Sequence, residues 1–301
     1  MSKIRKYVVS LGLVFFFGAV AAHADFRMER RLDLAPGGEF ELDAASGKIT
    51  VEGTDRAGVR VLITSSRDDV EDRFEFTFRE EAGRVLVKTE KRGSFVRRWF
   101  DWGSSLHFEV EVPRDVELLL DTSGGSIRVE DIIGPVVADT SGGAISVEQI
   151  FGDVHLDTSG GSITARRIDG NVLADTSGGR IEIDGASGEV NADTSGGSIS
   201  IKDVGGRVMA SSSGGSVTAS FAPGNAEGGS LSTSGGSVTA YVDPAVALDL
   251  DLSTSGGRAS SDLPVTVRGS FGRSSLRGQV NGGGALLKLR SSGGSVRVKE
   301  L

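Results

Sequence analysis

The chain has 301 residues, of which 41 are acidic, 33 are basic, 44 are glycine and none is cysteine, and its formal net charge is −8. Nucleic acid and anionic lipid are poor partners for such an acidic chain, so a nucleic-acid-binding function is not expected. The lack of cysteine excludes disulfides, thiol catalysis, a lipid-anchored N-terminal cysteine and cysteine-type zinc sites.

Residues 1–24 are predicted to be a secretory signal peptide. Three basic residues precede an apolar run from Tyr7 to Val20, and the sequence AHA at 22–24 then offers a small-x-small cleavage site. The run is shorter than the ~20 residues of a transmembrane helix, so we expect a mature chain with no transmembrane segment. The alternative is that this segment is retained as an N-terminal anchor. Export would place the protein in the periplasm, at the cell surface or outside the cell.

Residues 25–120 are predicted to form β-strands that cap or begin a repeat structure. Phrases such as EFELDAASGKITVEG, RFEFTFRE and LHFEVEVP alternate apolar and polar residues, as half-buried strands do. Both tryptophans and eight of the eleven phenylalanines that follow the leader lie in this region. The sequence AASGKITVEG at 44–53 resembles a degenerate copy of the repeat described below.

A loop with the sequence SFVRRWFDWG occupies residues 94–103 and has two interpretations. Aromatic side chains beside arginine are typical of recognition surfaces, which would make this loop a binding site. The alternative is that its aromatic rings fold back and cover the end of the repeat. The candidate recognition residues are Arg97, Arg98, Trp99, Phe100 and Trp102.

Residues 121–301 are organised by a repeated Ser-Gly-Gly. The first six copies follow one another at intervals of 18 residues and begin at Ser123, Ser141, Ser159, Ser177, Ser195 and Ser213. Further copies begin at Ser234 and Ser255, each after a step of 21, and at Ser292 after a step of 37. We therefore expect small insertions in the later coils and one coil that has lost its signature.

An all-β, single-chain β-solenoid with 18-residue coils is the predicted fold. Each period holds two short runs of alternating apolar residues, which are too short to bury an apolar face unless identical coils stack in register. A β-sandwich is the alternative, but it gives no reason for a strict period of 18. The predicted buried column consists of Ile127, Ile145, Ile163, Ile181 and Ile199.

Both bends of each coil, the Gly-Gly bend and the bend near Gly134, Gly152 and Gly170, are expected to use positive φ, which glycine reaches without steric cost. On this interpretation Gly161→Val damages folding more than Ser162→Ala does.

An aspartate stands two residues before five of the Ser-Gly-Gly copies. Stacked coils would hold these carboxylates ~5 Å apart, at a cost of up to ~1 kcal/mol for each neighbouring pair. One interpretation is that each carboxylate accepts hydrogen bonds from the amides of its own bend. The other is that calcium binds between coils, although later coils carry Ser211, Ser232 and Ser253 at this place. The aspartates are Asp121, Asp139, Asp157, Asp175 and Asp193.

No catalytic motif, metal motif or nucleotide-binding motif is present in the sequence. Only His107 and His155 remain after the leader, 48 residues apart, and His155 is expected on the outer face of its coil. We therefore predict no catalytic residue and no cofactor.

The phrase VEVPRDVELLLDTSGGSIRVEDIIG, the repeated ADTSGG coils and the ending LRGQVNGGGALLKLRSSGGSVRVKEL resemble the bacterial putative-adhesin family. The resemblance covers about residues 40–301 and implies an exported, all-β repeat protein of unknown function with no catalytic residues to transfer. The leading functional hypothesis is a non-catalytic adhesin or envelope scaffold that binds glycans or proteins through its elongated surface. The alternatives are a polysaccharide-acting β-helix enzyme, lyase or hydrolase, and an accessory of envelope assembly.

Overall fold

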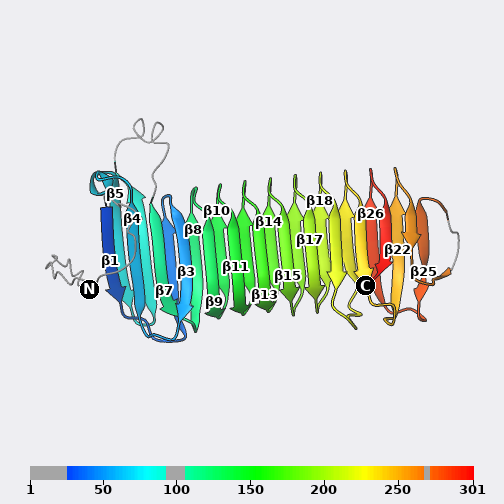
Figure 1. Cartoon of the computed structure of the whole chain (residues 1–301), viewed down its shortest axis with the longest axis horizontal. Coiled ribbons are helices and arrows are strands. Elements are labelled where there is room, and N and C mark those ends of the chain that lie inside the picture. The colour runs from blue at the N-terminus through cyan, green and yellow to red at the C-terminus, as the bar shows by residue number, and fades with distance from the viewer. Residues whose placement is uncertain (1–25, 93–105, 268–271) are drawn as a thin grey trace, which may run out of the picture.

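Two long β-sheets face each other along the molecule, and each repeat contributes one strand to each sheet (Figure 1). The computed structural model describes residues 26–92, 106–267 and 272–301. The predicted signal peptide and the loop residues Arg97 to Trp102 lie outside these ranges. Among the described residues, no helix has the length and apolarity that a membrane-spanning helix needs.

The two sheets are called sheet A and sheet B, and their strands are given in spatial order. Sheet A consists of β1 (Phe26–Leu32), β4 (Val59–Ser65), β7 (His107–Pro113), β3 (Lys48–Thr54), β9 (Ile127–Ile133), β11 (Ile145–Phe151), β13 (Ile163–Asp169), β15 (Ile181–Ala186), β17 (Ile199–Val204), β19 (Val217–Phe221), β21 (Val238–Val242), β27 (Val296–Glu300) and β23 (Ala259–Ser261). Sheet B consists of β24 (Thr266–Val267), β25 (Ser275–Val280), β22 (Leu248–Thr254), β26 (Ala285–Ser291), β20 (Gly229–Thr233), β18 (Val208–Ser212), β16 (Val190–Thr194), β14 (Val172–Thr176), β12 (Val154–Thr158), β10 (Val136–Thr140), β8 (Val116–Thr122), β2 (Gly38–Ala44), β6 (Arg84–Lys91) and β5 (Phe74–Glu81). The short helix α1 (Val70–Arg73) precedes β5.

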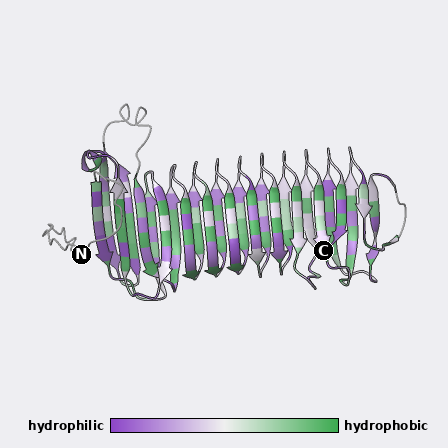
Figure 2. Cartoon of the chain, in the orientation of Figure 1, coloured by the Kyte–Doolittle hydropathy of each residue, from purple (hydrophilic) through white to green (hydrophobic). Residues whose placement is uncertain are grey.

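The core lies between the sheets and is built from the alternating apolar residues of each coil. Figure 2 shows hydrophobic and hydrophilic bands alternating along the strands. The five isoleucines from Ile127 to Ile199 pair in register on neighbouring strands, and each is at most 1% exposed. The predicted β-solenoid and its isoleucine column are therefore confirmed.

The long strands of sheet A bend at a residue in the left-handed conformation. The same place in five successive coils has a positive φ, at Asp131, Gln149, Arg167, Gly185 and Asp203. In the first of these coils, Val129 faces the core before the bend and Ile132 faces it afterwards. The bend therefore interrupts the two-residue alternation and turns the strand toward sheet B, at a cost in backbone strain for the four side chains other than glycine.

A ladder of buried hydroxyl groups joins the coils at the Ser-Gly-Gly bends. Thr158 Oγ1 donates a hydrogen bond of 2.8 Å to the carbonyl of Gly143 in the neighbouring coil and accepts one of 3.2 Å from the amide of Gly161 in its own bend. The donated bond recurs at Thr122, Thr140, Thr158, Thr176, Thr194, Ser212, Thr233, Ser291 and Thr254. Each hydroxyl group therefore ties its bend to the neighbouring coil, and those after Thr122 also accept a hydrogen bond from their own bend.

Thr158→Val is expected to lower the free energy of unfolding by ~1–3 kcal/mol, because valine keeps the shape of threonine but leaves buried backbone partners without their hydrogen bonds. Thr158→Ser is the matched control, since serine supplies the rung at Ser212 and Ser291. Urea denaturation measures both variants. Equal stability of the valine and serine variants would contradict a stabilising role for the ladder.

The second glycine of each bend lies against the backbone of the neighbouring coil. A Cβ placed on Gly161 would be 1.8 Å from the carbonyl oxygen of Gly143, and the same close approach recurs at Gly143 and Gly179. The expectation of positive φ was wrong for these Gly-Gly bends. At the opposite bend it is confirmed for Gly134 and Gly152 but not for Gly170. Glycine is needed in the Ser-Gly-Gly bends because coils stack too closely there for a side chain.

The N-terminal end is interleaved. The coil made of β2 and β3 lies between the β6–β7 coil and the β8–β9 coil, so residues 44–53 form a true copy of the repeat. Outside it, β1 pairs with β4, β4 with β7 and β5 with β6, all antiparallel. These strands cover the end of the parallel stack, as capping strands must. The boundary at residue 120 stays a prediction, because the strands on either side of it share both sheets and one hydrophobic core.

The C-terminal end is interleaved in the same way. Strands β26 and β27 enter between the β20–β21 coil and the β22–β23 coil, although they come last in the sequence (Figure 1). The step of 37 between Ser255 and Ser292 includes the antiparallel strand β25 rather than a coil without its signature. The expectation of a lost signature was wrong for this reason.

Candidate functional site

The predicted aspartates form a continuous column on the outward face of sheet B, here called the acidic column. Asp121, Asp139, Asp157, Asp175 and Asp193 pair in register from strand to strand. Asp43 on β2 extends the column by one position, because it pairs in register with Asp121. Asp43 was not among the predicted aspartates, since its coil carries DAASG in place of DTSGG and so lacks the Ser-Gly-Gly signature.

The acidic column does not cap its own bends. In the described residues, the hydrogen bond from the second glycine amide goes to the hydroxyl ladder, as in the bond from Gly161 to Thr158 Oγ1. The capping role predicted for the aspartates was therefore wrong. The hydroxyl residue that follows each aspartate, such as Thr158 after Asp157, faces inward and accepts the hydrogen bond of the bend instead. A hydroxyl residue stands at the ladder position in every Ser-Gly-Gly coil, which was the available signal.

The column accumulates negative charge. Partial burial raises the pKa of Asp139, and the neighbouring carboxylate of Asp157 raises it further. His155 opposes these effects, and Asp121 adds the smallest increase. Burial also raises the pKa of Asp121, Asp175 and Asp193. Compensating charge is found at one end of the column, where Lys88 Nζ lies 3.2 Å from Asp43.

Asp139→Asn is expected to raise the melting temperature at neutral pH. The pKa of Asp139 is raised in the folded state, so its ionisation weakens folding as pH rises through and above the ordinary aspartate value. The gain from asparagine should therefore disappear at a pH below about 3.9, where the carboxyl is protonated in both states. Thermal melts across pH measure the difference.

Asp251→Asn is the control of opposite sign. Burial alone would raise the pKa of Asp251, but hydrogen bonds from Arg290 and Arg277 outweigh it and lower the pKa. Its ionised form therefore stabilises the fold above the ordinary aspartate value, so asparagine should lower the melting temperature at neutral pH. A loss of stability in both variants would contradict the charge repulsion inferred for the column.

The calcium hypothesis concerns the same carboxylates. A shallow hollow of about 270 Å³ lies over Asp157, Asp175 and Asp193. Among residues 26–92, 106–267 and 272–301, no group of three or more His, Asp or Glu side chains converges as metal ligands would. His107 on β7 and His155 on β12 belong to different sheets, and His155 faces outward as expected.

Chelator is expected to leave the melting temperature unchanged. The reason is that Ser211 and Ser232 replace aspartate in later coils without any break in strand register, so the stacking needs no ion. Melting curves in EDTA and in millimolar calcium test this. A higher melting temperature in calcium would indicate an ion bound only to the folded state and would support the calcium hypothesis.

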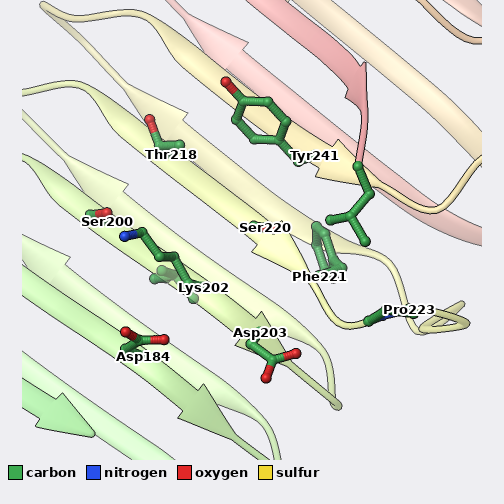
Figure 3. Close-up of a pocket in the computed structure, with 11 residues that line it drawn as sticks. Asp184, Ser200, Lys202, Asp203, Thr218, Ser220, Phe221, Pro223 and Tyr241 are labelled. Atoms are coloured by element: carbon green, nitrogen blue, oxygen red, sulfur yellow. The ribbon is translucent and has the colours of Figure 1, made fainter.

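A second surface, which no motif in the sequence indicated, lies on the outward face of sheet A. A groove of about 480 Å³, here called the Tyr241 groove, crosses β15, β17, β19 and β21 (Figure 3). Its centre is Ser220, which pairs with Tyr241 on one side, while Lys202 and Asp203 lie on the other. The side chain of Ser220 is small and those of Tyr241 and Lys202 on either side are long, so a hollow remains above Ser220.

The groove arises at an irregularity in the pairing of β17 with β19. Between β17 and β19 the register shifts, so that Lys202 and Asp203 together stand opposite Ser220 alone. Asp203 is the last of the left-handed residues that bend sheet A, at φ 52°. Such bulges re-aim side chains locally, and a single repeat read in isolation could not reveal one.

The exposed lining of the groove is mostly apolar, with Phe221, Pro223 and Leu301 in addition to Tyr241, and polar side chains of several types are set among these residues. Ser200 and Thr218 pair across β17 and β19, and Asp184 pairs with Lys202 across β15 and β17. None of the ion pairs found in the described part of the chain includes Asp184, Lys202 or Asp203. Lys299 Nζ lies 5.7 Å from the centre of the Tyr241 ring and approaches from β27, on the side of β21 away from the groove.

Comparison with known proteins shows which family shares this architecture. The model of the Toastrack DUF4097 family matches residues 38–299. The chain belongs to the Toastrack family. This confirms the family resemblance drawn from the DTSGG coils, and with it the repeat fold. No curated protein matches the chain.

Several solved structures are similar to this Toastrack chain. A putative adhesin from Parabacteroides distasonis ATCC 8503 is 12% identical, with 92% of this chain and 97% of that chain covered and a TM-score of 0.43. A putative lipid binding protein from the same organism is 14% identical, with 91% and 96% covered and a TM-score of 0.49. A putative adhesin from Bacteroides fragilis NCTC 9343 is 12% identical, with 92% and 97% covered and a TM-score of 0.42. The terms adhesin and lipid binding describe those proteins, and at this low identity the likeness to this chain is one of fold alone.

Proposed function

We propose that this Toastrack chain is an exported, non-catalytic binding protein that holds envelope or extracellular glycans or proteins on the outward faces of its solenoid. The observation that carries the proposal is the Tyr241 groove, where an aromatic ring, hydroxyl groups and charged groups meet on a rigid sheet. The lining of the groove is mostly apolar with a few polar groups, as is typical of ligand sites. The groove is also open, which leaves room for a polymer that lies across strands.

The rigidity of the scaffold supports a binding role. The groove side chains of β15, β17, β19 and β21 project from strands that are paired on both sides, and the bends of neighbouring coils are tied by the hydroxyl ladder. A preorganised surface loses little conformational entropy on binding, so moderate contacts give measurable affinity.

The test uses the mature chain without its predicted leader, immobilised through a C-terminal tag. Labelled envelope polysaccharides and envelope proteins are passed over it, and retention is compared with that on a Tyr241→Ala variant whose melting temperature is checked first. Retention that depends on Tyr241 supports the proposal. Failure to retain any polysaccharide or protein contradicts it. Sequencing the N-terminus of the exported protein tests cleavage after residue 24.

A polysaccharide-acting enzyme, lyase or hydrolase, is the second candidate. The observation in its favour is that Asp184 and Asp203 lie in the groove outside the acidic column, and paired carboxylates can perform acid–base chemistry on glycosidic bonds. Release of reducing ends or unsaturated sugars by the mature chain, lost in Asp184→Asn, would replace the binding proposal with this one.

A further inference from the structure

We propose that the Tyr241 groove binds one carboxylate-bearing pyranose, a uronic acid residue of an acidic polysaccharide. This inference rests on the proposed binding function and adds the chemical class of its ligand. The sugar ring would stack on Tyr241, its hydroxyls would meet Thr218 and Ser200, and its carboxylate would pair with Lys202.

The groove has the width of one sugar ring. Tyr241 on β21 and Lys202 on β17 stand two strands apart, with β19 between them. At the usual spacing of paired strands, the two backbones are about 10 Å apart. The small Ser220 forms the floor between them, as Figure 3 shows. A pyranose standing edge-on over Ser220 would contact the tyrosine ring on one side and lysine on the other.

The wall formed by Tyr241 suits the apolar face of a sugar. The face of an aromatic ring carries negative charge density, which complements the C–H bonds on one face of a pyranose. Lys299 already lies over the ring from the β27 side, so it helps to hold the ring in place from outside the groove. Tyr241 is thus held on one side and meets the groove on the other.

The opposite wall offers a charge that the protein itself leaves without a partner. No ion pair in the described ranges includes Lys202, although Asp184 is its neighbour in register on β15. A sugar carboxylate would give Lys202 a charge-assisted hydrogen bond. Ser200 and Thr218 can each donate and accept, which suits ring hydroxyls beside that carboxylate.

The two carboxylates of the groove lie away from the tyrosine wall. Asp184 comes from β15, one strand farther than Lys202. Asp203 shares with Lys202 the place opposite Ser220, but it stands at the bend, beside the loop that contains Pro223 (Figure 3). An acidic sugar over Ser220 is therefore separated from Asp184 by the lysine strand. A cationic sugar over Ser220 would face the ammonium group of Lys202, since Lys299 lies outside the groove.

The experiment measures calorimetric binding of a galacturonic acid tetrasaccharide and of its carboxyl-reduced, neutral counterpart, both in EDTA so that calcium cannot bridge the carboxylates. The mature chain should bind the acidic tetrasaccharide about tenfold more tightly or better, the difference that one charged hydrogen bond gives. Lys202→Gln should make the two affinities equal. Lys288→Gln, on the outward face of sheet B, is the matched control and should change neither.

Tyr241 has its own pair of variants. Tyr241→Ala should lower affinity for both sugars by about tenfold or more, and Tyr241→Phe should retain binding because the ring remains. Equal affinities of the unaltered chain for the two sugars would overturn the acidic-sugar inference, yet leave a glycan-binding function standing. Binding that survives Tyr241→Ala would place the sugar elsewhere and overturn the site. No binding of either sugar overturns the inference, whereas the retention experiment decides the broader function.

Discussion

Gly161→Ala is expected to prevent the solenoid from folding or to lower its melting temperature severely, whereas Gly160→Ala leaves it folded. A Cβ on Gly161 would be 1.8 Å from the carbonyl oxygen of Gly143, while one on Gly160 would be 3.7 Å from the nearest atom, the carbonyl oxygen of Gly142. Overpacking typically costs ~1–3 kcal/mol, and here the obstacle is backbone that cannot yield without separating two coils.

The two glycines are adjacent in one bend and undergo the same substitution, so chain composition and intrinsic propensity are matched. Circular dichroism melts and urea denaturation measure both variants. Similar midpoints for the two would show that the coils can move apart locally, and would contradict close stacking as the reason for the second glycine.

Ile163→Ala is expected to lower the free energy of unfolding by ~2–4 kcal/mol, as buried truncations that leave a cavity do. Ile163 lies fully buried between Ile145 and Ile181 in the isoleucine column. The surrounding structure cannot collapse into the space, because backbone hydrogen bonds fix the spacing of the three strands.

Thr164→Ala is the control for Ile163→Ala, since residue 164 is on the same strand with its side chain on the outward face. Its effect should stay within about 0.5 kcal/mol. An unchanged denaturation midpoint for Ile163→Ala would be incompatible with the observed burial.

The regular part of the fold could be predicted because each coil repeats the same physical problem. The spacing of Ile127 and Val129 predicts a strand with one buried face, and the period of 18 predicts that identical strands stack. The family resemblance added the expectation of an all-β repeat. Strand existence and register in the middle coils therefore agree with the sequence interpretation.

The features that escaped prediction depend on contacts between unlike segments. The bend hydrogen bonds are an exception, because their signal was in the sequence: the alternation that buries Val154 and Leu156 also turns Thr158 inward and Asp157 outward. The Tyr241 groove arises from a mismatch between β17 and β19, so no single coil contains its signal. The interleaved ends likewise depend on long-range pairing.

The interleaved C-terminal end imposes an order of assembly on the chain. A solenoid whose coils follow the sequence can add each coil to the one before it, but here β22 and β23 must wait for β26 and β27 before they join the stack. Contacts of such long sequence separation slow folding, because loop closure comes before the pairing that rewards it. Coil-by-coil growth from the middle of the solenoid therefore stops after β21 until β26 and β27 pair with it. The C-terminal end then forms in one step rather than one coil at a time.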